Sequence, residues 1–215
     1  MESSLSARKR PASEASVVRA ALDIVDALPG GGGEITLAAV ARRVGIATPS
    51  VYKHVSSLAD LQRKVAVVCV RELKEHMTDA VVGRSGDDAL RAIIQSTRTF
   101  ALAYPGRYAA TQVAANRDDV DDADLARESD QLIRVIGASL VGYGLVENTL
   151  IDAIRVVRAA VHGFILLELG GGFGLPKSIT QSFEVLTETL VAGVNSLSAQ
   201  GSAQGSARIQ TGTAS

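Results

Sequence analysis

Apolar residues recur at helical spacing along almost the whole chain. The clearest example is the run of Phe183, Leu186, Leu190, Val194 and Leu197, in which the intervals are three or four residues. That period places side chains on one face of an α-helix, whereas a half-buried strand alternates apolar and polar residues. No stretch of the 215 residues alternates for long enough to predict a strand. The sequence therefore predicts an all-α fold with about nine helices.

Capping residues and clusters of glycine and proline divide the periodic pattern into separate helices. Helices are expected at about 13–28, 36–44, 48–54, 58–82, 87–104, 107–115, 123–142, 147–169 and 179–197. Ser57 and Asp60 have the spacing of a capping box at the start of the fourth helix.

The two ends of the chain have the composition of disordered segments. Residues 1–12 are small, polar and basic, with Arg8, Lys9 and Arg10 in succession, and residues 198–215 are rich in Ser, Gly, Ala and Gln. Such segments cannot bury enough apolar surface to order themselves. We expect a disordered basic arm at 1–12, which either touches DNA or only solubilises the chain, and a disordered tail at 198–215.

The composition favours the cytoplasm. The basic cluster at 7–10 is not followed by an apolar run, so a secretory signal is not expected. The most apolar stretches, near 135–146 and 156–172, are too short or too interrupted to span ~30 Å of hydrocarbon. Cys69 is the only cysteine, which rules out a disulfide or a cysteine-based zinc site within one chain. We therefore predict a protein of a reducing compartment, the cytoplasm, with no membrane segment, metal or cofactor.

Charge is distributed unevenly along the chain, although the net charge is only −1. Residues 1–82 carry 11 Lys and Arg against 9 Asp and Glu, and residues 83–215 carry 11 against 14. A basic N-terminal module on a more acidic partner domain has this pattern. Any binding of nucleic acid must therefore depend on local charge in the N-terminal part.

The most informative stretch is TLAAVARRVGIATPSVYKHV, at residues 36–55. Two short helices that cross at a steep angle need a small residue at the crossing, and Ala41 provides it. The turn between them needs a residue that tolerates positive φ, and Gly45 provides that. Thr48 and Pro49 are typical of an N-cap followed by a first-turn proline. This arrangement predicts a helix-turn-helix.

The faces left outside this motif carry polar and basic side chains that suit phosphates and base edges. The candidate DNA-binding residues are Thr36, Arg43, Thr48, Pro49, Ser50, Tyr52, Lys53 and His54. Tyr52 is the only aromatic residue among the first 99, and its place beside Lys53 favours a hydrogen bond to phosphate. The alternative is that the motif consists of two ordinary short helices in an all-α core.

Residues 13–70 resemble the DNA-binding domain of the TetR family of transcriptional regulators. The matching features are the leading helix, the motif at 36–55 and a long helix from Leu58. The rest of the chain resembles the branch with a "WHG" C-terminal domain, through AYPGRYAAT at 103–111, AVHGFILLELGGGFGLP at 160–176 and the final helix. Two positions depart from the family pattern. Leu58 stands where members often have a phosphate-binding lysine, and the chain contains no tryptophan.

The resemblance implies a ligand-responsive regulator that is not an enzyme, most often a repressor released from its operator by a small molecule. Residues 13–57 would be the helix-turn-helix domain, and residues 58–197 would bind the effector and form a homodimer. A two-fold dimer places its recognition helices in successive major grooves about 34–36 Å apart, so the operator would be an inverted repeat in double-stranded DNA.

The helices that follow residue 99 hold seven of the eight aromatic residues and are the expected place of the effector and dimer contacts. The predicted effector residues, for a largely hydrophobic molecule, are Phe100, Tyr104, Tyr108, His162 and Phe164. The predicted dimer stripe is Phe183, Leu186, Leu190 and Val194, paired with the helix around 154–167. The alternative for each of these residues is ordinary packing in a core.

Two other classes of function remain open from the residues alone. A helical-bundle enzyme could use the C-terminal cavity, although no Ser-His-Asp or Cys-His set can be proposed from spacing. A helical adaptor could act without touching DNA. Strong, salt-sensitive binding to a specific duplex would argue against both.

Overall fold

The computed structural model describes residues 11–27 and 35–211, and for residues 200–211 it describes the backbone alone. Within these ranges the chain forms nine α-helices and two short 3-10 helices, without a strand. The all-α prediction is therefore confirmed. Arg8, Lys9 and Arg10 and the glycine run at 30–33 lie outside the described residues.

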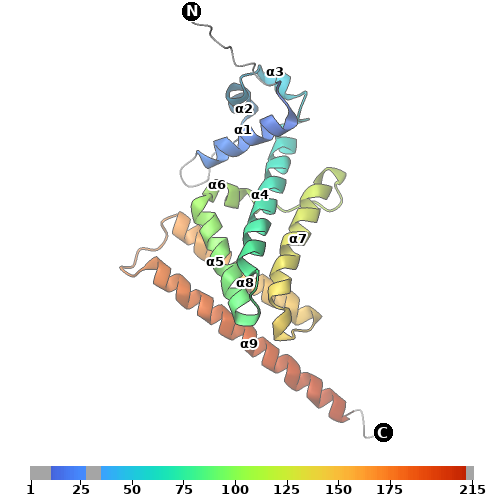
Figure 1. Cartoon of the computed structure of the whole chain (residues 1–215), viewed down its shortest axis with the longest axis vertical. Helices are drawn as coiled ribbons and strands as arrows, with labels where there is room; N and C mark the ends of the chain where they lie inside the picture. Colours follow the sequence, from blue (N-terminus) through green and yellow to red (C-terminus); the bar gives the residue numbers. More distant parts are fainter. Residues whose placement is uncertain (1–10, 28–34, 212–215) are drawn as a thin grey trace, which may run out of the picture.

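Three N-terminal helices form a small cluster at one end of the molecule (Figure 1). They are α1 (Glu14–Asp26), α2 (Leu37–Val44) and α3 (Thr48–Val51). α1 begins at a capping box, in which Ser13 and Ser16 exchange hydrogen bonds between hydroxyl and backbone amide. The cluster closes around fully buried Val17, Val40 and Val51.

The long helix α4 (Leu58–Val81) joins this cluster to the rest of the molecule (Figure 1). Its first half contributes Leu61 and Val65 to the N-terminal core, and its second half contributes Leu73 and Met77 to the C-terminal core. One helix therefore belongs to both cores and connects them.

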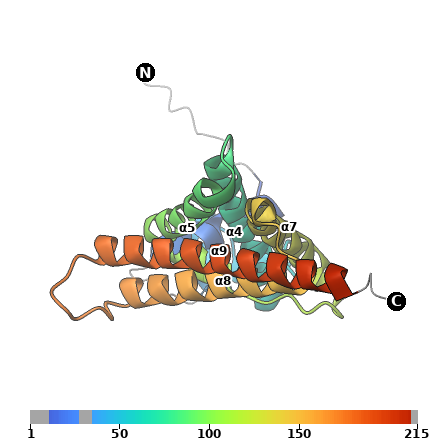
Figure 2. The same cartoon turned by 90° about the horizontal axis from the view of Figure 1, so that it is seen from below.

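The C-terminal domain contains the remaining elements. They are α5 (Gly86–Ala103), α6 (Pro105–Ala110), η2 (Val120–Asp122), α7 (Ala123–Ser139), η3 (Val141–Tyr143), α8 (Glu147–Leu169) and α9 (Ile179–Thr211). Figure 2 shows α8 and α9 side by side along one face of the molecule. The helices α4, α5 and α7 lie together on one side of this pair. In the described part of the chain, no helix is both long and apolar enough to cross a membrane.

The helix boundaries differ from the sequence-based prediction at four places, the first of which is α3, predicted at 48–54, which ends at Val51. α6 begins at Pro105, because a proline fits the first turn of a helix, and it ends at Ala110 rather than near 115. α7 ends at Ser139, three residues before the predicted boundary at 142. The backbone of α9 continues to Thr211, whereas the composition predicts disorder from residue 198.

α6 packs directly on the end of α1, and this contact links the two parts of the molecule. A Cβ atom added to Gly106 would lie 2.4 Å from the carbonyl oxygen of Val25 and 2.6 Å from its Cγ1. Next to it, the Arg107 guanidinium forms ion pairs with Asp26 of α1 and Glu72 of α4. α6 is therefore tied to both α1 and α4.

Candidate nucleic-acid interface and effector cavity

The turn between α2 and α3 has the geometry that the sequence predicts. Thr36 caps α2 by accepting a hydrogen bond from the Ala39 amide at 3.2 Å. Ala41 is 2% exposed, so a larger side chain would not fit there. Gly45 has φ 78° and ψ 40°, which is the left-handed region that glycine adopts without strain. Both the Gly45 and the Ile46 amides donate to the Ala41 carbonyl, and this pairing closes the turn.

α3 begins one residue earlier than a threonine cap would allow. Ala47 occupies the N-cap, and no side chain caps the helix, so the prediction that Thr48 is the N-cap is wrong. Thr48 is instead the first helical residue and is exposed. Val51 and Val55 are buried beneath the helix and fix its orientation.

The opposite side of α3 and the residues after it face solvent. Thr48, Pro49, Tyr52 and Lys53 are exposed, and Ser50 and His54 are half-buried. Tyr52 exposes 56% of its surface, a large fraction for an aromatic residue. Among the described residues, no carboxylate forms an ion pair with Lys53, so its ammonium is available to a phosphate.

Two further candidates, Thr36 and Arg43, have structural partners. Thr36 uses its hydroxyl as the cap of α2. Arg43 donates from Nε to Asp23 Oδ2 at 3.0 Å, and both side chains are close to half exposed. A phosphate at Arg43 would therefore compete with the α1 carboxylate, which is a modest cost for an exposed ion pair.

The start of α4 is held by side chains rather than left open. The Ser57 hydroxyl accepts from the Asp60 amide at 3.0 Å, and Asp60 accepts from the Ser56 amide at 2.8 Å. The capping box predicted at Ser57 therefore forms in part. The Ser57 hydroxyl caps the Asp60 amide as predicted, but the Asp60 carboxylate accepts from the Ser56 amide and not from the Ser57 amide. Burial alone would raise the pKa of Asp60, but hydrogen bonds from Ser56 and Lys64 outweigh it and lower that pKa. Leu58 is half-buried and packs on the N-terminal core.

The five predicted effector residues do not form one site. Phe100 and Tyr104 line an open groove of about 720 Å³ between α4 and α5, which also contains charged residues of both helices. Phe164 packs against Phe173 and Phe183, with ring centroids 4.7 and 5.1 Å away.

Tyr108 and His162 do come together. The Tyr108 hydroxyl lies 3.0 Å from His162 Nδ1. Burial raises the pKa of Tyr108 to about 12. Burial, and then the charge of Arg158, lower the pKa of His162 below its usual value. Near neutral pH the tyrosine therefore keeps its proton and the imidazole is neutral, and the tautomer of His162 decides which of the two groups donates the hydrogen bond.

This pair lies at a narrow, mostly apolar cavity between α4, α5, α7 and α8, with a volume of about 40 Å³. It is lined by Leu73, Met77, Ile93, Ile94, Thr97, Tyr108, Thr111, Gln112, Leu132, Ile136, Val157, Arg158, Val161 and His162. Sequence reasoning missed Arg158, although it precedes His162 by four residues on one helix and so shares its face.

The predicted dimer stripe is packed inside the chain. Phe183, Leu190 and Val194 are 1%, 8% and 3% exposed, and Leu186 packs against the same core. In the single chain these side chains pack on the protein's own core, so the predicted stripe leaves little apolar surface for a second chain. Exposed apolar side chains instead occupy other faces of α8 and α9, at Val156, Leu166, Leu167 and Val185.

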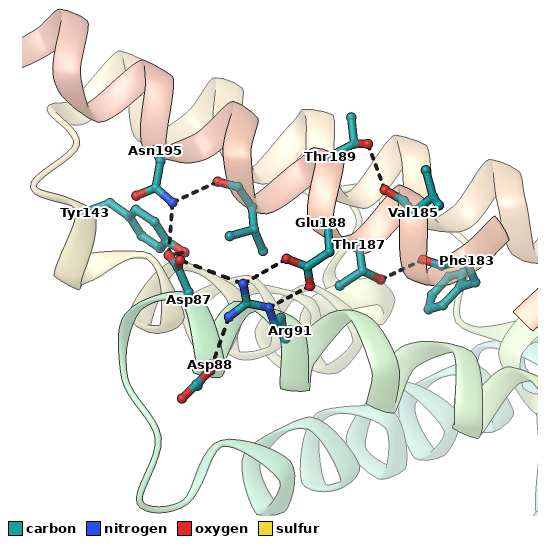
Figure 3. Close-up of polar contacts among 11 residues, drawn as sticks. Asp87, Asp88, Arg91, Tyr143, Phe183, Val185, Thr187, Glu188, Thr189 and Asn195 are labelled. Atoms are coloured by element: carbon teal, nitrogen blue, oxygen red, sulfur yellow. Dashed lines mark hydrogen bonds and ion pairs between the residues drawn. The ribbon is translucent and has the colours of Figure 1, made fainter. Parts of the chain in front are cut away.

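Polar contacts fix α9 against α5, as Figure 3 shows. Arg91 donates to both carboxylate oxygens of Glu188, at 2.8 and 2.9 Å. Asp87 accepts from the Tyr143 hydroxyl at 2.7 Å and from Asn195 Nδ2 at 3.1 Å. Together with the apolar contacts beneath, these bonds set which face of α9 points to solvent.

Comparison with known proteins gives a consistent result for both parts of the chain. Residues 90–190 match the family described as tetracyclin repressor-like, C-terminal domain, and residues 16–62 match the IclR helix-turn-helix domain. The uncharacterized HTH-type transcriptional regulator Rv0681 of Mycobacterium tuberculosis is 32% identical over 166 residues, which are 77% of this chain and 74% of that protein. YobS of Bacillus subtilis, with the same description, is 29% identical over 83% of this chain and 90% of its own length.

Solved structures share the fold. SCO7222, a TetR from Streptomyces coelicolor, has a TM-score of 0.65 at 17% identity, over 87% of this chain and 99% of that chain. BioQ with its double-stranded DNA operator has a TM-score of 0.53 at 18% identity, over 86% of this chain and 99% of that chain. With the turn at Gly45, the exposed α3 and the relatives above, these matches show that the chain belongs to the TetR family of transcriptional regulators.

Proposed function

We propose that the protein is a homodimeric repressor that binds an inverted-repeat operator in double-stranded DNA and is released by a small molecule. The observation that carries the proposal is the exposed side of α3. There Tyr52 and Lys53 face solvent, while Val51 anchors the helix from beneath. The BioQ structure contains an operator duplex, which supports operator DNA as the class of partner.

On DNA, the residues of this motif divide into two groups. Lys53 and Tyr52 contact phosphates and set the position of the helix, because their long side chains extend beyond it. Thr48, Pro49 and Ser50 lie at the helix start and approach the base edges of the major groove. This surface is flanked by His54, Arg43 and Thr36, which add contacts to the DNA backbone.

The two-fold interface uses the exposed faces of α8 and α9. Val156, Leu166 and Leu167 on α8 and Val185 on α9 leave about half or more of their surface in solvent. A Cβ atom added to Gly163 or Gly193 would meet nothing within 4 Å, so helices of a second chain can approach closely. Four such helices would form a bundle across the two-fold axis.

The effector enters at the cavity that contains Tyr108 and His162. Leu73 and Met77 of α4 form part of its wall, so a molecule that widens the cavity displaces α4. That displacement changes the separation of the two α3 helices, and the dimer no longer fits successive grooves. Effector and DNA then oppose each other by the same coupling free energy. The protein performs no chemistry in this cycle and acts on DNA in the cytoplasm.

Selection of bound duplexes from a random pool tests the proposal. We expect enrichment of an inverted repeat whose half-sites are centred about one helical turn, or a multiple of it, apart. Loss of enrichment at high salt is expected, because phosphate contacts release counterions. Recovery of no enriched sequence, or of a single asymmetric site bound by a monomer, would contradict the proposal.

A further inference from the structure

Among the described residues that line the cavity, Arg158 is the only permanently charged side chain, and neither Asp nor Glu is present. Two arginines that bridge neighbouring helices have their charge balanced by carboxylates. Arg98 donates to Glu168 at 2.6 and 2.8 Å, and Arg107 lies between Asp26 and Glu72. Within the described part of the chain, no carboxylate pairs with Arg158, which is exposed, so its positive charge lies between the lining of the cavity and solvent.

The second polar group at the cavity, His162, offers a hydrogen-bond donor in one of its two neutral tautomers. In the tautomer that carries its proton on Nε2, His162 accepts from the Tyr108 hydroxyl at Nδ1 and has Nε2–H left as a donor. Arg158 has donors and no acceptor. Arg158, together with His162 in that tautomer, therefore matches a ligand group that only accepts hydrogen bonds.

We propose that the ligand of this cavity is a small amphiphilic carboxylic acid. Its apolar body occupies the space lined by Ile93, Ile94 and Ile136, and its carboxylate pairs with Arg158. A carboxylate has only acceptors at neutral pH and accepts two bonds from one guanidinium. This inference rests on the proposed function, because it names the chemical class of the effector.

The size of the cavity shows what the ligand must do to enter. A volume of about 40 Å³ holds only a few water molecules, so the acid displaces side chains as it binds. Met77 is the flexible member of the wall, and Leu132 of α7 is only half-buried. A filled cavity therefore presses on α4 at Met77, where the proposed release of DNA begins.

Calorimetry on the full chain at pH 7.5 tests the charge preference. The probes are octanoate, octanamide and octylamine, which share one apolar body and differ in the charge of the head group. We expect octanoate to bind about tenfold tighter than octanamide, and octylamine to bind more weakly than either. An Arg158→Gln variant should bind octanoate and octanamide equally.

The control is Arg155→Gln, which removes a neighbouring exposed arginine of α8 that does not line the cavity. It should keep the preference for octanoate. Equal binding of acid and amide by the wild type, a preference that survives Arg158→Gln, or no saturable binding of octanoate would overturn the proposal. Duplex binding is measured separately on the same preparations. A protein that binds its selected operator but not octanoate thus refutes the ligand class alone, and one that binds no duplex refutes the proposed function.

Discussion

Arg107 and Asp26 are 81 positions apart in the sequence, and their side chains meet at 2.5 Å between Nη2 and Oδ2. The same guanidinium donates to Glu72 at 2.8 and 2.9 Å and lies over the Tyr104 ring. One cation thus joins the end of α1, the middle of α4 and the start of α6. Any motion of α6 acts on α1 and α4 together.

Replacement of Arg107 by Met should weaken the junction between the domains. We expect the free energy of unfolding to fall by about 1–3 kcal/mol, because two partly buried carboxylates lose their charge-assisted hydrogen bonds. Chemical denaturation measures the change. Arg127→Met is the matched control, because the Arg127–Asp124 pair lies on the surface and should contribute less than about 1 kcal/mol. Equal losses in the two variants would contradict the role of Arg107.

Lys53→Ala should weaken binding to every duplex, specific or not. The slope of log affinity against log salt should fall by about one for each phosphate that the variant no longer neutralises. Fluorescence anisotropy at several salt concentrations measures both quantities. Lys177→Ala, in the loop between α8 and α9, removes the same charge far from α3 and should change neither. An unchanged slope for Lys53→Ala would mean that α3 does not dock as proposed.

Ser50→Ala should alter the choice among operator variants rather than the overall affinity. The expected change is about 1–3 kcal/mol at the base pair that Ser50 contacts, with little change elsewhere in the site. Competition between operators that differ at single positions measures it. A uniform loss at all positions would place Ser50 on the phosphate backbone instead.

Val185→Arg should yield a folded monomer that binds the operator poorly. Val185 is 59% exposed, so the charge is tolerated in one chain but not in an apolar interface. Light scattering after size-exclusion chromatography gives the mass. Leu190→Ala is the contrasting variant, since Leu190 is buried in the chain's own core and its truncation should cost about 2–5 kcal/mol of stability. A Val185→Arg protein that remains a dimer would exclude this face of α9.

The stability of the protein should depend on pH through His162. Its pKa in the folded state lies below the usual 6.5, because of burial and the charge of Arg158. Between this folded pKa and pH 6.5, the unfolded chain therefore binds a proton that the folded chain does not bind. The contribution of neutral His162 to the free energy of unfolding is fully present above pH 6.5 and is lost as pH falls through the folded pKa. Between pH 7.5 and 5, the Tm of the wild type should fall more than that of His162→Gln. Parallel curves would exclude His162 as the titrating group.

The sequence predicted local features more accurately than it predicted partners. Ala41 and Gly45 were identified because a steep crossing and a left-handed turn each restrict the residue type at one position. The cap of α3 was assigned wrongly to Thr48. Capping preferences are statistical, and here buried Val51 and Val55 hold α3 without a side-chain cap.

Periodicity showed which face of α9 is apolar, but not what that face packs against. Phe183 contacts Phe164 and the guanidinium of Arg98, both in the same chain, so the stripe completes a core. The candidate effector residues do not lie in one site for a related reason, because spacing in the sequence does not show where each side chain packs. Tyr104 and Tyr108 are only four positions apart, yet the chain turns at Pro105, and Tyr104 is exposed while Tyr108 is buried.

The close approach of Gly106 to Val25 has a consequence for hybrids built from different relatives. The Val25 carbonyl occupies the space that any side chain at position 106 would need, so α1 and α6 keep their present spacing only with glycine there. A chimera that takes residues 1–57 from one parent and the remainder from another inherits the two sides of this contact from different backgrounds. Exchange of α1 together with α6 keeps the matched surfaces in one piece. Recombination with its crossover point placed to preserve that pair should therefore yield folded hybrids more often than recombination at the apparent domain boundary.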